Sequence, residues 1–539
     1  MEKGKFRALI LTMQFRREFM TLSPTNAETQ TTKLVSALML IGILSKLMGF
    51  LREVVLANCY GATAHMDAFN IANNIPVILL AGLAAAITNT FIPTFINKKE
   101  NNGLDEALGL SQRLFTVTGF TGVLLSLLGI ILAPQIAIIL APKFSPEKLA
   151  ITANLSRILL IGGAVAMSNG FLTGFLQANR SLIIPALVGF PSNLMIIVVV
   201  LLFSEQHGIY ALAFGSVASF VAQFLFQLPF CLKKKLVVAP KLEFPDPDVR
   251  RVVRLVLPVF AGSLVLQINT IFDRIFASGL PDGSIAALGY ANRLTGLVFS
   301  IVTTAVVTVS LPIMAQAAAV KQMSALKDAM LTAIRGSNCL IMPMSVGMIV
   351  LRCPIVKLVF ERGAFDSAAT ELTATALLYL SLGLVAYSIR EIVSRVFYAI
   401  EDTKTPMINS IFSVSINIMI MILSVPRLGL VGVTLSTSLS GMVSAAMLLF
   451  RLRRKIGSVH GKSIIKSLKI TIIAALLMAA AVHFSYIGLE HLVQGTSFLM
   501  QTVRMAVTVA VGVLVYVLVL YIFKAEELQF VKNLIRRKG

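Results

Sequence analysis

The sequence predicts an all-α polytopic membrane protein. Of the 539 residues, 57% are hydrophobic and only 13% are charged, whereas about a quarter of the residues in a soluble domain are charged. Apolar runs of about 20 residues, long enough to cross a bilayer, recur between charged, proline and glycine residues. These runs give about fourteen transmembrane spans, at residues 34–57, 67–96, 108–141, 151–178, 181–204, 208–232, 255–280, 284–315, 329–351, 370–400, 406–425, 428–450, 465–486 and 500–523.

Basic residues predict the orientation in the membrane. The formal net charge of +22 would suggest nucleic-acid binding in a soluble protein, but here the basic residues gather in alternate loops. By the positive-inside rule, those loops and both termini are expected in the cytoplasm. The loop 352–369 is an exception, because it carries Lys357 and Arg362 on the expected outer side. The other outer loops carry few basic residues, such as Lys143, Lys148 and Arg427.

A polar interruption divides the chain into two lobes. Prolines 240, 245 and 247 indicate an extended linker, and the sequence VRRVVRLV after them predicts a short interfacial amphipathic helix. The expected parts are a basic N-terminal tail (1–33), an N-lobe of six spans (34–232), the linker with its helix (233–254), a C-lobe of six spans (255–454), and two final spans with a basic tail (455–539).

A weak internal repeat supports two pseudo-symmetric six-helix lobes. An ungapped offset of 224 positions pairs Asn193 with Asn417 and Gly208 with Gly432, and a nearby offset pairs Arg52 with Arg274. Parallel duplicated halves are a common transporter plan, with the substrate path between them.

Charged residues within the expected spans mark the substrate path, because a lone charge in hydrocarbon is costly. Arginine predominates, which suits an anionic substrate because guanidinium groups bind phosphate oxygens through paired hydrogen bonds. The alternative is that a single arginine extends its head group to the membrane interface or forms a structural ion pair. Glu391 and Arg395 could form such a pair, because they are four residues apart. Asp273 and Arg274 point about 100° apart, so one can line a cavity while the other pairs elsewhere. The charges in the spans are Lys46, Arg52, Glu53, Arg157, Asp273, Arg274, Arg293, Arg390, Glu391 and Arg395.

No catalytic, metal or cofactor site is expected. The segment GSVHGKS at 457–463 is one residue short of a phosphate-binding loop, and the histidines and cysteines are scattered. Energy for transport is therefore expected from a coupling cation or from the membrane potential.

Several motifs resemble the MurJ/MviN family of lipid II flippases over residues 34–454. They are LSKLMGFLRE, YGATAHMDAF, FIPTF, INTIFDRIFASGLPDGSIAALGYANRL, TVSLPIMA, FERGAF and RVFYAIEDTKTP. The resemblance implies membership of the multidrug/oligosaccharidyl-lipid/polysaccharide exporter superfamily. It also implies a central cationic cavity and two extra C-terminal helices that form a groove for the lipid tail.

The resemblance also implies site residues. Arg52 matches the cavity arginine of span one, Glu53 matches its acidic neighbour, and Asp67 matches the acid of the D-A-F motif. Arg293 in YANRL matches the arginine of span eight, and Lys46 matches the first basic position of span one, which makes it a second candidate.

One departure concerns span two. The family often has an arginine pair shortly after the proline, whereas this chain continues from Pro76 with VILLA, and Asn73 and Asn74 are the nearby polar residues. Arg274 is the hypothetical replacement for the missing charge. The departure leaves room for a related polyprenyl-linked substrate.

The resemblance thus implies an alternating-access flippase that moves lipid II, a polyprenyl-diphosphate-linked peptidoglycan precursor, to the outer leaflet of the bacterial cytoplasmic membrane. Arg52, Arg274 and Arg293 would hold the diphosphate, Asp67 would act as a gate or pair with them, and Asp273 is a secondary candidate. The protein is expected to be a monomer that binds no nucleic acid, with cell-wall synthesis proteins as candidate partners. Alternatives are an exporter of another polyprenyl-linked saccharide, a cation or drug antiporter, and a non-transporting scaffold.

Overall fold

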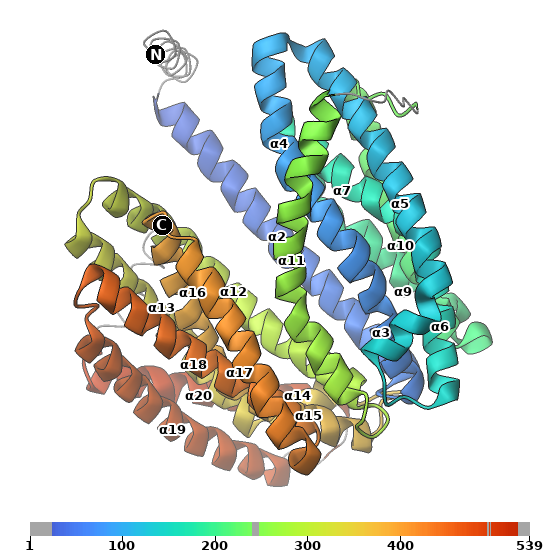
Figure 1. Cartoon of the computed structure of the whole chain (residues 1–539). Helices are drawn as coiled ribbons and strands as arrows, with labels where there is room; N and C mark the ends of the chain where they lie inside the picture. The colour runs from blue at the N-terminus through green and yellow to red at the C-terminus, as the bar shows by residue number, and fades with distance from the viewer. Residues whose placement is uncertain (1–23, 240–246, 493–494, 496, 526–539) are drawn as a thin grey trace.

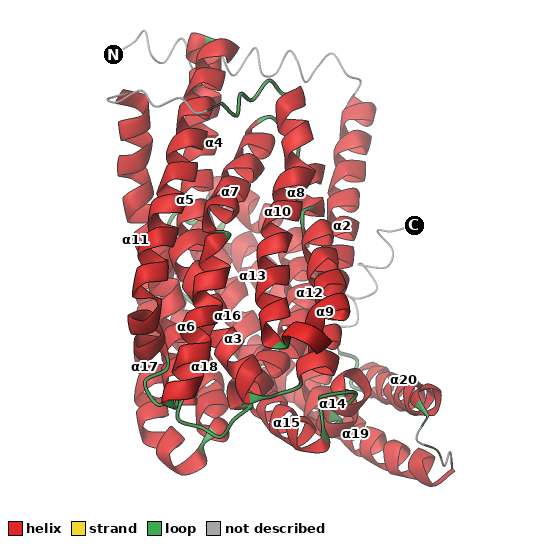
Figure 2. Cartoon of the chain, turned by 90° about the vertical axis from the view of Figure 1, so that its right-hand side faces the viewer, coloured by secondary structure: helices red, strands yellow, loops and turns green. Residues whose placement is uncertain are grey.

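The computed structural model describes residues 24–239, 247–492, 495 and 497–525, and these residues form helices and no strand (Figure 2). Within this described part of the chain, ten helices are long and apolar enough to cross a membrane, or twelve if each of two bent pairs is one span. The all-α polytopic fold is thus confirmed, while the number fourteen stays a prediction. The outermost residues of both expected tails and residues 240–246 of the linker lie outside the described part.

The helices form two lobes that meet at one end and diverge towards the end where α4 joins α5 (Figure 1). The N-lobe contains α2 (Pro24–Tyr60), α3 (Ala64–Pro76), the π-helical segment η1 (Val77–Ala81), α4 (Gly82–Asn102), α5 (Leu104–Leu140), α6 (Pro146–Ile161), α7 (Gly163–Ala178), α8 (Ile183–Leu187), α9 (Gly189–His207) and α10 (Ile209–Lys233).

The C-lobe begins with a helix that also contacts the N-lobe. Its elements are α11 (Pro247–Ala277), α12 (Ser284–Ala319), α13 (Met323–Val350), α14 (Arg352–Phe360), α15 (Ser367–Leu382), α16 (Leu384–Ala399), α17 (Lys404–Leu428) and α18 (Leu430–Ile456). Two further helices, α19 (Gly461–Leu492) and α20 (Phe498–Ile522), pack against each other and against α13.

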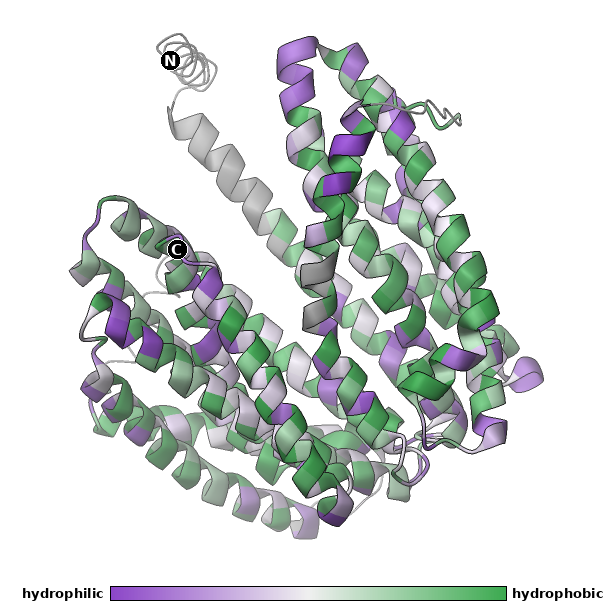
Figure 3. Ribbon diagram, in the orientation of Figure 1, coloured by the Kyte–Doolittle hydropathy of each residue, from purple (hydrophilic) through white to green (hydrophobic). Residues whose placement is uncertain are grey.

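Apolar side chains cover the outward surfaces of the outer helices. On α5 the exposed fraction of Ile131 is 70%, and on α20 that of Leu514 is 69%. Figure 3 shows hydrophobic residues along much of α5. Such surfaces are costly in water and suited to lipid, which agrees with the membrane assignment.

The two lobes share backbone breaks that reveal the repeat register. Helices α6 and α7 bend by 47° at Gly162, and α15 and α16 bend by 43° at Gly383. Gly208 ends α9 with φ 54° and ψ −137°, and Gly429 ends α17 with φ 56° and ψ −127°. Gly162 and Gly383 are 221 residues apart, and so are Gly208 and Gly429. The structural counterpart of Gly208 is therefore Gly429, and its pairing with Gly432 from the sequence is wrong. The ungapped comparison missed this because apolar helices match at several registers, whereas only glycine readily adopts this positive φ.

The interfacial helix expected after the linker is instead the start of α11. This helix runs unbroken from Pro247 to Ala277, and Val249, Val252 and Val256 are buried in the core of the N-lobe. Lys98 of α4 pairs with Asp248 at the same end. The apolar face of VRRVVRLV therefore packs on protein rather than on a lipid surface. As a result α11 contacts α4 and α5 of the N-lobe as well as α17 of the C-lobe.

Candidate functional site

Asp67 connects the two lobes where they meet. Thr63 caps α3 by accepting a hydrogen bond from the Met66 N–H, which places Asp67 on the first turn. The carboxylate is buried, with an exposed fraction of 1%, and it accepts hydrogen bonds from the backbone N–H groups of Gly283 and Ala286, both at 2.8 Å. Because these donors belong to the start of α12, a carboxylate of the N-lobe caps a helix of the C-lobe, where it also favours the helix dipole.

Lys148 extends this contact. It lies on the first turn of α6, and its Nζ is 3.0 Å from Oδ2 of Asp67 and 2.7 Å from Oδ1 of Asp282. Its ammonium group also lies 4.1 Å from the centre of the Phe144 ring. The sequence analysis placed Lys148 among the few basic residues of the outer loops, and no local motif distinguishes it. Its role depends on contacts with residues far away in the chain.

Backbone and aromatic contacts complete the junction. The N–H of Ala364 donates to Asn58 O at 2.8 Å, and the Tyr290 hydroxyl donates to Gly61 O at 3.2 Å. The Tyr290 ring packs against Phe360, with ring centres 5.0 Å apart. We call the contacts made by Asn58, Gly61, Asp67, Gly283 and Ala364 the gate. The expected outer loop 352–369 thus forms α14 and supplies part of the gate through the FERGAF motif.

A pocket of about 210 Å³ adjoins the gate, which we call the charged pocket. Glu53, Asn70, Arg274 and Arg293 line it, together with Met66, Ala286, Gly289, Tyr290 and Asn292. Oε1 of Glu53 lies 3.3 Å from Nε of Arg293 and 2.5 Å from Nη2 of Arg52. Glu53 therefore pairs with one arginine from each lobe.

The charged pocket has an excess of positive charge. Arg274 and Arg293 line it together with one acid, Glu53, and Arg52 pairs with Glu53 beside it, so these four side chains carry two net positive charges. The Arg293 side chain is 59% exposed and that of Glu53 is 8% exposed, so Arg293 is the cation most open to a ligand. Arg274 donates a long hydrogen bond of 3.4 Å to Ile285 O.

The other residues singled out in the sequence lie elsewhere. Lys46 is exposed on α2 and does not line the charged pocket. Asp273 faces Asn417 of α17 at 3.5 Å. Asn74 donates to Asn70 O at 2.9 Å, while Asn73 lines a second pocket in the N-lobe. Among the described residues, no cluster of three or more His, Cys, Asp or Glu side chains could hold a metal ion.

Two of the remaining membrane charges have local partners. Arg395 pairs with Glu391 at 2.5 Å on α16, as their spacing allowed. Arg157 is exposed on α6 and donates to Asn154 at 3.2 Å.

Comparisons with known proteins agree with this arrangement. The family model described as "Lipid II flippase MurJ" matches residues 56–526. A probable lipid II flippase MurJ of Vibrio cholerae is 29% identical over 433 residues, covering 77% of this chain and 81% of the relative. Its counterpart from Rickettsia prowazekii is 27% identical over 493 residues, covering 89% of this chain and 95% of the relative.

Solved structures also resemble this chain. A structure of lipid II flippase MurJ in an inward closed conformation matches with a TM-score of 0.75 and 25% identity, covering 90% of this chain and 98% of that one. An inward-facing multidrug transporter of the MATE family matches with a TM-score of 0.66 and 18% identity, covering 78% of this chain and 98% of that one. The second likeness shows a shared fold.

Proposed function

Since this chain belongs to the lipid II flippase MurJ family, we propose that it carries lipid II across the bilayer and holds the diphosphate in the charged pocket. It is a multi-pass protein of the bacterial inner membrane, and its family consists of transporters rather than enzymes. The observation that carries the assignment of the site is the meeting of Arg274 and Arg293 with Glu53 of the other lobe.

The chemistry of the charged pocket favours a diphosphate. Guanidinium groups stay charged at any relevant pH and bind phosphate oxygens through paired hydrogen bonds. A ligand with two negative charges would balance the two net positive charges of Arg52, Glu53, Arg274 and Arg293. A cation antiporter would need the opposite excess of charge.

Binding and gating are coupled through Glu53. A diphosphate at Arg293 would compete with the Glu53 carboxylate, which now joins the two lobes at 3.3 Å. Release of Glu53 would weaken the junction beside the Asp67 contact, so an anionic ligand would favour opening of the gate. This follows the general rule that a ligand shifts a conformational equilibrium by its different affinity for the two states.

The direction of transport follows from the distribution of basic loops. The connection between α4 and α5, which follows Lys98 and Lys99, lies at the end opposite the gate (Figure 1). The positive-inside rule assigns that end to the cytoplasm, together with both termini. The divergent end of the lobes would then admit lipid II from the inner leaflet, and the gate would release it outside. The coupling energy would come from a cation gradient or the membrane potential.

The last two helices would guide the lipid tail. They pack against α13 at the edge of the C-lobe and expose apolar side chains such as Phe484, Leu499 and Leu514. A monomer is sufficient for this scheme, because both lobes and the tail-guiding helices belong to one chain. Cell-wall synthesis proteins remain candidate partners.

Lipid binding by the purified full-length protein tests the proposal. Replacing Arg293 with Ala should weaken lipid II binding by about 10- to 100-fold, the effect expected for losing charge-assisted hydrogen bonds. Lipid transfer in vesicles should fall accordingly, whereas Arg293→Lys should retain part of the affinity. The matched control is Arg157→Ala, which removes an exposed arginine that lines neither pocket. Unchanged affinity in a folded Arg293→Ala protein would refute the assignment.

A further inference from the structure

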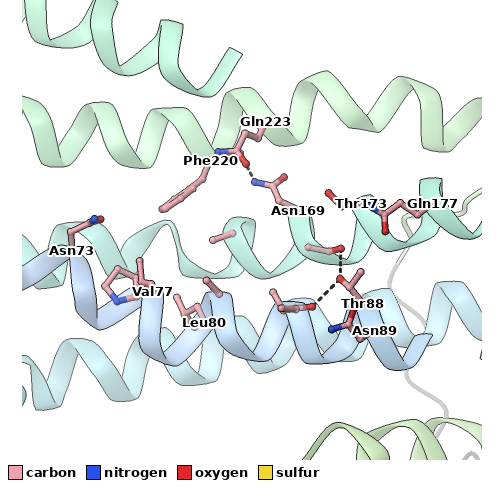
Figure 4. Close-up of a pocket in the computed structure, with 16 residues that line it drawn as sticks. Asn73, Val77, Leu80, Thr88, Asn89, Asn169, Thr173, Gln177, Phe220 and Gln223 are labelled. Atoms are coloured by element: carbon pink, nitrogen blue, oxygen red, sulfur yellow. Dashed lines mark hydrogen bonds between the residues drawn. The ribbon is translucent and has the colours of Figure 1, made fainter. Parts of the chain in front are cut away.

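A second pocket of about 510 Å³ lies inside the N-lobe, between the α3–η1–α4 segment and helices α7 and α10 (Figure 4). Its volume falls within the range of about 300–1,000 Å³ typical of small-molecule sites. We propose that this pocket, which we call the amide pocket, binds the uncharged, N-acetylated saccharide of the lipid-linked substrate. The proposal rests on the proposed function and names a second subsite for the same ligand.

Neutral hydrogen-bonding groups dominate the polar lining. Five carboxamides and two threonines face the amide pocket, and none of its described lining residues is charged. A carboxamide offers both donors and an acceptor, so it matches sugar hydroxyls and N-acetyl groups. A carboxylate of a peptide would lack a counter-ion here, and an alkyl tail would offer no hydrogen-bond partner to an exposed amide such as that of Asn89. These polar residues are Asn73, Thr88, Asn89, Asn169, Thr173, Gln177 and Gln223.

Asn169 offers a buried acceptor at the pocket wall. Its exposed fraction is 6%, and its Nδ2 donates to the carbonyl of Phe220 at 2.9 Å. Its Oδ1 receives no hydrogen bond from the described residues. An unpaired buried oxygen carries a desolvation cost, which a hydroxyl donor from a ligand would remove. The Phe220 ring at the same wall offers a flat apolar surface for the face of a sugar ring (Figure 4).

Small residues create the space. Ala81, Ala85 and Gly170 line the pocket, and an added Cβ on Gly170 would collide with Ala84 at 2.6 Å. Helices α4 and α7 therefore pack closely on one side, and the π-helical segment at 77–81 shifts the helix register beside them. Such π segments are frequent at functional sites. Ala81 and Ala85 are exposed, which leaves the pocket accessible from one side.

The amide pocket is placed to receive the group next to the diphosphate. Asn70 lines the charged pocket and Asn73 lines the amide pocket. These residues are about one turn apart on α3, a rise of about 4.5 Å. A sugar bonded directly to a diphosphate could thus enter the amide pocket while the phosphates contact the arginines. The arginine pair that the family resemblance leads us to expect after Pro76 is missing along this same segment, where a neutral pocket lies instead.

The test compares two lipids on the full-length protein in detergent. One is plain polyprenyl diphosphate, and the other is the same lipid carrying an N-acetylated sugar. We expect the wild type to bind the sugar lipid about tenfold more tightly, the gain that one or two net hydrogen bonds give. Ala85→Phe should fill the pocket and abolish this preference, while affinity for the plain lipid stays the same.

A matched control and a milder variant complete the design. Ala446→Phe makes the same change at an exposed position of α18 that lines neither pocket, and should keep the preference. Asn89→Ala removes one exposed amide of the pocket and should reduce the preference even if Ala85→Phe fails to fold. A preference that survives in Asn89→Ala and in folded Ala85→Phe, or a wild type without preference, would overturn the proposal. Arg293→Ala reports on the proposed function separately, because it should weaken both lipids equally.

Discussion

Replacing Asp67 with Asn should open the gate. The substitution keeps the size of the side chain but removes its charge and one acceptor. Asp67 now accepts two backbone N–H groups of α12 at 2.8 Å and pairs with Lys148 at 3.0 Å. An asparagine has only one acceptor oxygen, so its NH₂ group would face a donor.

The size of the effect follows from these contacts. A hydrogen bond to a charged group contributes about 1.5–3 kcal/mol, and breaking a buried ion pair costs about 3–5 kcal/mol. Part of this loss is recovered, because Lys148 keeps Asp282, whose side chain is 70% exposed. We therefore expect the closed gate to lose about 3 kcal/mol relative to the open one, a change of about 10²-fold in their ratio.

Cross-linking across the gate measures this ratio. Asn58 and Ala364 come from different lobes and share a backbone hydrogen bond of 2.8 Å, so cysteines at these positions lie within disulfide reach when the gate is closed. The four native cysteines would first be replaced by serine. Under mild oxidation the double-cysteine protein should cross-link rapidly, and adding Asp67→Asn should slow the reaction strongly.

The control is Asp366→Asn. Asp366 also caps a helix near the gate, but it accepts from Ala369 inside the C-lobe at 2.8 Å. Its replacement should leave the cross-linking rate unchanged. If Asp67→Asn cross-links as fast as the parent protein, the capping contact does not hold the lobes together and the reasoning is refuted.

Glu53→Gln should lower the melting temperature of the purified protein, because Arg52 and Arg293 lose the acid that pairs with them. Added pyrophosphate should restore stability more in this variant than in the wild type, and equal responses would contradict the prediction. Gly61→Ala should open the gate, because the positive φ of 60° disfavours alanine and a Cβ would collide with the carbonyl of Ala364. The cross-linking rate between positions 58 and 364 should fall as a result. The Lys455 ammonium and the Thr405 donors lower the pKa of Asp402 to about 2, below the usual value of about 3.9. Because the folded pKa is the lower one, the stabilisation is complete above about pH 4 and is lost as the pH falls towards 2. The stabilisation amounts to about 1 kcal/mol or less for this surface pair. The melting temperatures of wild type and Asp402→Asn should therefore converge as the pH is lowered. A difference that stays constant with pH would show that the ion pair contributes nothing.

Part of the site was predictable from local sequence. The excess of arginine over acid in the spans indicated an anionic ligand, and the adjacent Asp273 and Arg274 were expected to point to different places. In the structure Arg274 lines the charged pocket and Asp273 faces Asn417. Helical geometry alone gives this divergence, since neighbouring residues differ by about 100°.

The sequence by itself determined the membrane-embedded helical class and the family, because the cost of placing a residue in lipid depends on its own stretch of chain. The tertiary structure decided which charges meet. Asp67 and Gly283 are separated by 216 positions, and Lys148 and Asp282 by 134. Such pairs form only when the lobes pack against each other, so neither hydropathy nor helix periodicity contains them. Tertiary contacts within the N-lobe likewise brought Lys148 to Asp67 and set the π-helical segment beside the amide pocket.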